Sequence, residues 1–115
     1  MKKTIKIGDK DYFMKASAYT QFAYKNETGR SFLKDIQKLT EITKDGEIVL
    51  ESLDEVNELV LKIAYVIIEE ADPKQAANYE DFLKNIDNLY DNQEWITEVI
   101  LLACSPISRQ LQENK

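Results

Sequence analysis

Residues 60–68, VLKIAYVII, limit the possible folds more than any other stretch, because they are apolar around nearly the whole circumference of a helix. Only a narrow stripe with Lys62 and Glu69 is polar, and Tyr65 lies at its margin. Such a helix is stable only when other elements cover it, since burial of apolar surface offsets the cost of ordering the chain. We therefore predict a central helix over residues 52–70.

The ends of this central helix are marked by capping signals. Ser52 followed by Glu55 is a capping box, in which each side chain satisfies a free backbone donor of the first turn. Asp72-Pro73 ends the helix, because proline cannot continue the hydrogen-bond ladder. Glu69 and Glu70 lie at the negative end of the helix dipole, so we expect a basic partner nearby.

A second apolar stretch, WITEVILLAC at residues 95–104, follows another capping signal at residues 91–94. Pro106 is expected to end this last helix. Two largely apolar helices are hard to cover in a chain of 115 residues. Either the other elements enclose both helices, or part of their surface contacts another protein.

The N-terminal segment predicts a β-hairpin, because apolar residues alternate on both sides of Gly8-Asp9, a two-residue turn signal. This turn places Ile5 opposite Tyr12 and puts one set of side chains on one face: Ile5, Ile7, Tyr12 and Met14. Phe13 falls on the other face, with Thr4 and Lys6. A two-stranded hairpin is marginal alone and needs a helix to pack on.

The segment around Gly29-Arg30-Ser31 is predicted to join two helices. Ser17 caps the first helix, which is expected to run to about residue 26. Gly29 follows it and favours the left-handed conformation that closes a helix C-terminus. The inward positions of the first helix are expected to be Tyr19, Phe22 and Ala23, with Tyr24 off this stripe. Ser31 starts the second helix, whose expected inward positions are Phe32, Leu33, Ile36 and Leu39.

A phosphate-binding loop is the alternative interpretation of Gly29-Arg30-Ser31. Such a loop normally has more glycines and a preceding strand, so helix punctuation is favoured. Arg30 is kept as a candidate binding residue, because its guanidinium pairs well with anions.

Residues 47–51 are either a loop or a short strand. Asn78 caps a short helix with Phe82, Leu83, Ile86 and Leu89 inward. The expected fold is mainly α, of the α+β class: an N-terminal β-hairpin followed by a bundle of about five helices. We expect one domain over residues 1–115, with the hairpin at 1–16, the helical bundle at 17–105 and a frayed tail at 106–115.

The composition argues against an enzyme. The chain has no histidine, the commonest general base and metal ligand, and one cysteine, Cys104, which follows an apolar run and is expected to be a packed thiol. Carboxylates at 69–72 or at 87–94 could hold a metal ion, but neither group has the spacing of a calcium loop. We expect no cofactor, no metal and no membrane span, and a cytoplasmic protein.

The charge is distributed unevenly along the chain. Residues 1–44 contain ten Lys or Arg against five Asp or Glu, whereas residues 45–115 contain five against sixteen. The net charge of −6 opposes nonspecific binding of nucleic acid. The asymmetry can orient copies against one another or against a partner. It is also compatible with an acidic decoy, a protein that mimics nucleic acid and inhibits an enzyme such as a nuclease or polymerase.

The order of these segments resembles the tail assembly chaperones of long-tailed bacteriophages and prophages of Gram-positive hosts. The resemblance rests on IKIGDKDYFMKAS, YTQFAYKNETGRSFLKDIQKL, IAYVIIEEADP, YEDFLKNID and the final apolar helix. Family members often have an acidic residue after TGR, where this chain has Ser31, and the link after Asp72-Pro73 lacks a further proline. The resemblance implies a small helical protein without catalytic residues.

Such a protein binds the tape measure protein and keeps it soluble until the tail tube polymerises around it. The resemblance also implies self-association, a frameshifted longer form that recruits tube protein, and a location in the host cytoplasm rather than in the mature virion. Aromatic residues at the margins of the predicted core stripes are the expected contact residues, because this type is favoured at interface centres. The candidates for partner binding are Tyr24, Tyr65, Tyr90 and Trp95, together with Arg30.

Overall fold

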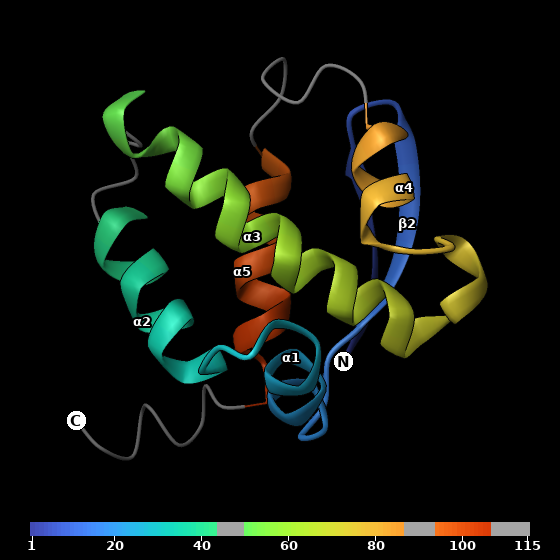
Figure 1. The fold of residues 1–115 in the computed structure, drawn as a ribbon, viewed down its shortest axis with the longest axis horizontal. Coiled ribbons are helices and arrows are strands. Elements are labelled where there is room, and N and C mark those ends of the chain that lie inside the picture. The colour runs from blue at the N-terminus through green and yellow to red at the C-terminus, as the bar shows by residue number, and fades with distance from the viewer. Residues whose placement is uncertain (44–49, 87–93, 107–115) are drawn as a thin grey trace.

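The computed structural model describes residues 1–43, 50–86 and 94–106, and it confirms the predicted α+β fold (Figure 1). A β-hairpin is followed by five α-helices and one 3-10 helix in these ranges. The elements are β1 (Lys2–Ile7), β2 (Lys10–Lys15), α1 (Thr20–Thr28), α2 (Phe32–Thr43), α3 (Leu50–Ala71), η1 (Pro73–Gln75), α4 (Tyr79–Lys84) and α5 (Glu94–Cys104). No helix in the described ranges is both long enough and apolar enough to cross a membrane.

The hairpin has the predicted register. Ile5 pairs with Tyr12 across the antiparallel strands, and Gly8 takes a positive φ of 64° in the turn. The four side chains expected on the inner face are all buried: Ile5, Ile7, Tyr12 and Met14. Phe13 is on the outer face and is exposed, as predicted.

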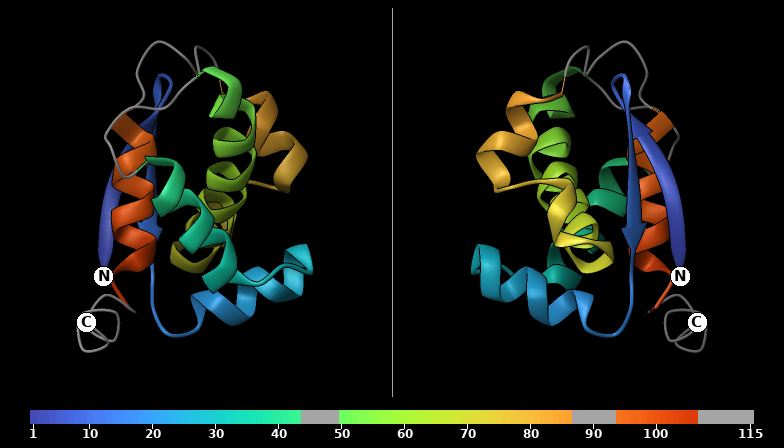
Figure 2. Two further views of the ribbon diagram at one scale, coloured as in Figure 1. Left: turned by 90° about the vertical axis from the view of Figure 1, so that its left-hand side faces the viewer. Right: turned by 90° about the vertical axis from the view of Figure 1, so that its right-hand side faces the viewer.

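Helix α3 is the centre of the molecule and packs against β2, α1, α2, α4, α5 and η1 (Figure 2). Its apolar residues between 60 and 68 are buried, which confirms the central position, and it ends before Asp72-Pro73 as expected. The predicted start at Ser52 is wrong, because the backbone is already helical at Leu50. Glu55 pairs with Lys38 of α2 instead of completing a capping box.

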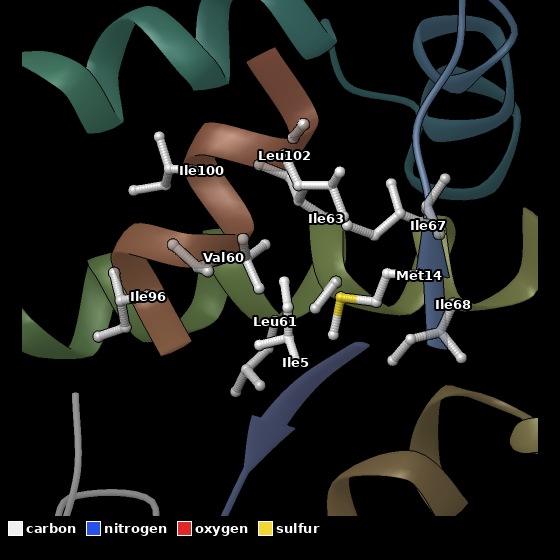
Figure 3. Packing of buried hydrophobic residues seen from close by; sticks show 14 of the residues in the cluster. Ile5, Met14, Val60, Leu61, Ile63, Ile67, Ile68, Ile96, Ile100 and Leu102 are labelled. Atoms are coloured by element: carbon white, nitrogen blue, oxygen red, sulfur yellow. The ribbon is translucent and has the colours of Figure 1, made fainter. Parts of the chain in front are cut away.

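The two apolar helices are enclosed within the described part of the fold. The inner face of the hairpin and α5 cover α3, and side chains from all three interdigitate in one cluster (Figure 3). Trp95, Ile96, Val99, Ile100 and Leu102 of α5 are buried, and only Leu101 among its large apolar residues is exposed. Of the two alternatives, enclosure therefore holds for α3 and for α5 apart from Leu101, and the other exposed large apolar side chains of the described residues lie outside these two helices.

Capping interactions fix the short elements as the sequence indicates. Gly29 has a φ of 71° and its N–H donates to the Lys25 carbonyl at 2.8 Å, which ends α1. The Ser31 hydroxyl accepts from the Lys34 N–H at 3.3 Å at the start of α2. Asn78 Oδ1 accepts from the Asp81 N–H at 2.8 Å and starts α4, whose Phe82 is buried while Leu83 is exposed.

Gln75 shields the outer edge of β2. Its side-chain amide accepts from the Phe13 N–H at 2.8 Å and donates to the Phe13 carbonyl at 2.7 Å. One carboxamide thus replaces one peptide unit of a neighbouring strand, which protects an edge that could otherwise pair with another chain.

Several predictions lie outside the described residues. These are the structure of residues 47–49 of the possible strand at 47–51, the position of Leu89, the start of the last helix at 91–93, and the tail at 107–115. Leu50 and Glu51, at the end of the possible strand, are helical.

Candidate interaction surface

Helix α1 presents to solvent the face that its sequence predicts to be inward. Tyr19 and Phe22 are 59% and 60% exposed, whereas Tyr24, expected off the core stripe, is completely buried. The helix begins at Thr20 rather than Ser17, and Thr20 is the other residue on its buried face. The prediction of the inward face of α1 is therefore wrong for Tyr19 and Phe22, whereas Ala23 is partly buried and packs against the core as expected.

A buried network holds Tyr24 inward. Its hydroxyl donates to Asp35 Oδ2 at 2.5 Å, and Arg30 donates to both oxygens of the same carboxylate at 2.7 and 3.0 Å. Burial would raise the pKa of Asp35, but the hydrogen bonds from Arg30 and Tyr24 outweigh it and lower that pKa. Burial, reinforced by the Asp35 charge, raises the pKa of the Tyr24 hydroxyl. The network therefore joins the end of α1 to the first turns of α2.

Polar contacts also fix the beginning of α1. Glu70 of α3 accepts from the Ser17 hydroxyl and from the Thr20 hydroxyl, each at 2.7 Å. Ser17 is thus part of the turn before α1 and a partner of Glu70, not the helix cap. The expected basic partner is absent among the described residues, because hydroxyls satisfy Glu70 and no ion pair forms with Glu69.

A shallow groove of about 190 Å³ lies between α1 and α2. Its lining residues are Gln21, Phe22, Lys25, Ser31, Phe32 and Leu33. Leu33, predicted to be inward, is 49% exposed here. The buried stripe of α2 consists instead of Phe32, Asp35, Ile36 and Leu39. The exposed apolar side chains of this region, which we call the α1–α2 face, are Tyr19, Phe22 and Leu33. Phe22 and Leu33 line the groove, whereas Tyr19, one turn before Phe22, lines a cavity on the α3 side of α1. Figure 2 shows α1 at the end of the molecule, below α2 and α3.

Two further cavities meet at Glu27, on the side of α1 that faces α3. One of about 290 Å³ is lined by Lys62, Tyr65 and Tyr79 among others, and one of about 190 Å³ by Glu69 and Glu70 among others. Burial, a hydrogen bond with Glu69 and repulsion from Glu69 raise the pKa of Glu27 to about 7. Burial and both carboxylates raise the pKa of Tyr65 to about 12.

The Glu27 and Glu69 pair predicts a pH dependence of stability. An acid whose pKa rises from 4.5 to about 7 on folding binds more protons in the folded protein between these values. The free energy of unfolding is therefore expected to fall as pH rises through this window. The carboxyl group of Glu27 is partly buried, but the residue as a whole is exposed. The expected loss of unfolding free energy is therefore that of a surface charge pair, about 0.5 to 1 kcal/mol.

Urea denaturation of Glu27→Gln at about pH 5 and about pH 8 checks this expectation. The substitution should reduce the difference in stability between the two pH values. Glu41→Gln, at an exposed position of α2, is the control and should leave the difference unchanged. Equal pH dependence in all three proteins would show that the carboxylates do not share a proton.

The structure separates the predicted partner-binding residues. Tyr24 and Trp95, predicted as contact residues, are buried and lie on no surface of this fold: Tyr24 donates to Asp35, and Trp95 fills the core beside α3. Tyr65 is half-buried, with its ring against Tyr79 and Phe82 at centroid distances of 5.5 and 5.7 Å. Arg30 is exposed but occupied by Asp35. Tyr90 lies outside the described residues.

Little in the described residues points to chemistry. No group of three or more Cys, Asp or Glu there is arranged to hold a metal ion, and the predicted 87–94 group lies partly outside them. Burial raises the pKa of the Cys104 thiol, which opposes formation of a reactive thiolate. The features that stand out are thus an apolar face and a carboxylate pair on the two sides of α1.

Comparison with protein-family models, with curated proteins and with solved structures found no match.

Proposed function

We propose that this chain is a phage tail assembly chaperone, which binds the tape measure protein and keeps it soluble until the tail tube polymerises around it. Two things support the proposal. The order and residues of the segments resemble that family over nearly the whole chain. The α1–α2 face exposes aromatic and aliphatic side chains on adjacent helices, as the docking site of an amphipathic helix requires.

The α1–α2 face is the observation that carries the proposal. Tyr19, Phe22 and Leu33 are each about half exposed or more, and the last two line one groove. The face is held outward by the contacts of Tyr24 with Asp35 and of Thr20 with Glu70 on the opposite side of α1. An exposed apolar surface maintained by buried polar contacts is typical of a binding site, because folding alone would favour its burial.

Replacing Phe22 and Leu33 together by aspartate is expected to abolish binding of the tape measure protein. The substitutions put charges where apolar side chains would be desolvated, and a loss of about 2 kcal/mol or more is typical at the centre of an interface. The check is co-expression in bacteria of the chaperone with a tagged tape measure protein encoded beside it. Both the amount of co-purified chaperone and the soluble fraction of the tape measure protein are measured.

Phe13→Asp is the matched control. Phe13 is also an exposed phenylalanine, but it lies on the outer face of the hairpin, and its hydrogen bonds with Gln75 are made by its backbone. This variant should bind as the unsubstituted protein does. Failure of the unsubstituted protein to bind or solubilise the tape measure protein would refute the function, whereas binding by Phe22→Asp/Leu33→Asp would refute the surface.

A further inference from the structure

The lysines beside the α1–α2 groove differ from the other lysines of the α-helices. Three helical lysines pair with glutamates: Lys38 with Glu55, Lys62 with Glu58 at 3.3 Å, and Lys84 with Glu80 at 3.0 Å. Lys25 and Lys34 are the two lysines in the described α-helices without an ion-pair partner there. Lys25 lines the groove, and Lys34 is exposed and follows Leu33, a lining residue, in the chain.

The groove also lacks acidic side chains. None of its lining residues is Asp or Glu, although the chain as a whole has a net charge of −6. Asp35, in the first turns of α2, is neutralised by Arg30 and buried away from solvent. An apolar groove bordered by unpaired cations attracts a ligand that is apolar at its centre and negatively charged at its margins.

We propose that the α1–α2 face selects amphipathic helices whose apolar stripe is bordered by acidic residues. Phe22 and Leu33 bury the stripe, while Lys25 in the groove and Lys34 next to Leu33 pair with carboxylates at its margins. The inference deepens the proposed function, on which it rests for the identity of the partner. It specifies the chemistry of the tape measure segment that is bound.

Synthetic helices test this selectivity without the tape measure protein. Three fluorescent peptides of about 18 residues share one leucine stripe and carry glutamate, glutamine or lysine at its margins. The glutamate peptide is expected to bind about fivefold more tightly than the glutamine peptide, the effect of two exposed ion pairs, and the lysine peptide more weakly than either. The preference should largely disappear at about 0.5 M salt, where such pairs are screened.

Charge reversal gives the decisive comparison. Lys25→Glu/Lys34→Glu should invert the order of the glutamate and lysine peptides, whereas Lys74→Glu, at an exposed position of η1, should not change it. Phe22→Asp should weaken all three peptides. Equal binding of the peptides by the unsubstituted protein, or an unchanged order after charge reversal, would overturn the inference.

The alternative occupant of the groove is a second copy of the chain, and sedimentation of the protein alone tests for it. If Phe22→Asp/Leu33→Asp converts an oligomer to a monomer, copies of this chain fill the groove and the inference is wrong. Selective peptide binding without binding of the tape measure protein would instead refute the proposed function and leave the selectivity of the face intact.

Discussion

Trp95→Ala is expected to lower the free energy of unfolding by about 3 to 5 kcal/mol, the range for removal of a buried aromatic side chain. Trp95 is 1% exposed, and it belongs to the cluster in which α5 and the hairpin cover α3. Its loss leaves a cavity that the surrounding isoleucines and valines cannot fill completely. Urea denaturation followed by circular dichroism measures the change, since the variant lacks the only tryptophan of the chain.

Trp95→Phe is the matched comparison and is expected to cost about 1 to 2 kcal/mol. It keeps an aromatic ring and removes the indole N–H, which is buried and has no hydrogen-bond partner among the described residues. Under conditions where both variants remain folded, both should still bind the tape measure protein. A loss of binding by folded Trp95→Phe would restore Trp95 as a contact residue, contrary to its buried position.

The sequence predicts the hairpin, the central helix and most helix ends because each depends on local chemistry. Gly8 and Gly29 take the positive φ that few other residues tolerate, and Ser31 and Asn78 supply capping oxygens. The stretch at residues 60–68 leaves almost no polar face, so its burial follows from composition alone.

The face of α1 could not be predicted in this way, because it depends on residues far away in the sequence. Two stripes are possible on this helix, one with Tyr19 and Phe22 and one with Thr20 and Tyr24. Apolar character favours the first stripe. The second is buried because a carboxylate from α2 and one from α3 satisfy its hydroxyls, and a single sequence does not reveal such contacts.

The candidate site was missed for the same reason. Apolar character predicts that Phe22 and Leu33 lie in the core, whereas residue type and a place at the margin of a stripe predict that Tyr24 and Trp95 lie at the surface; the observed burial is the reverse. One signal was present in the sequence: Arg30 and Asp35 are five residues apart across the start of a helix, close enough to pair and to attract a tyrosine hydroxyl.

Asp35→Ala is expected to lower the free energy of unfolding by about 3 kcal/mol, the lower end of the range for breaking a buried ion pair. Asp35 accepts from Arg30 and Tyr24, so the substitution leaves the Tyr24 hydroxyl buried without its partner. The cost is at the lower end because Arg30, whose side chain is 45% exposed, can be solvated instead. Urea denaturation near neutral pH measures the effect.

A double-mutant cycle with Tyr24→Phe separates the orphaned hydroxyl from the other consequences. Tyr24→Phe alone should cost about 1 kcal/mol, because Asp35 keeps Arg30. In the Tyr24→Phe background, Asp35→Ala should cost about 1 to 2 kcal/mol less than in the unsubstituted protein, since no buried hydroxyl remains to be orphaned. Additive effects would show that the two side chains act independently.

The same network makes stability sensitive to acid. A carboxyl whose pKa is lowered on folding stabilises the protein above its ordinary value of 3.8, and this contribution is lost as pH falls through the lowered pKa. Asp35→Ala should therefore lose less stability on acidification than the unsubstituted protein.

The network also links stability to binding, because it holds Tyr24 inward and so keeps Phe22 outward. If it fixes α1 in this rotation, Asp35→Ala should weaken binding of an acidic amphipathic peptide even where the variant is fully folded, whereas Trp95→Phe should not.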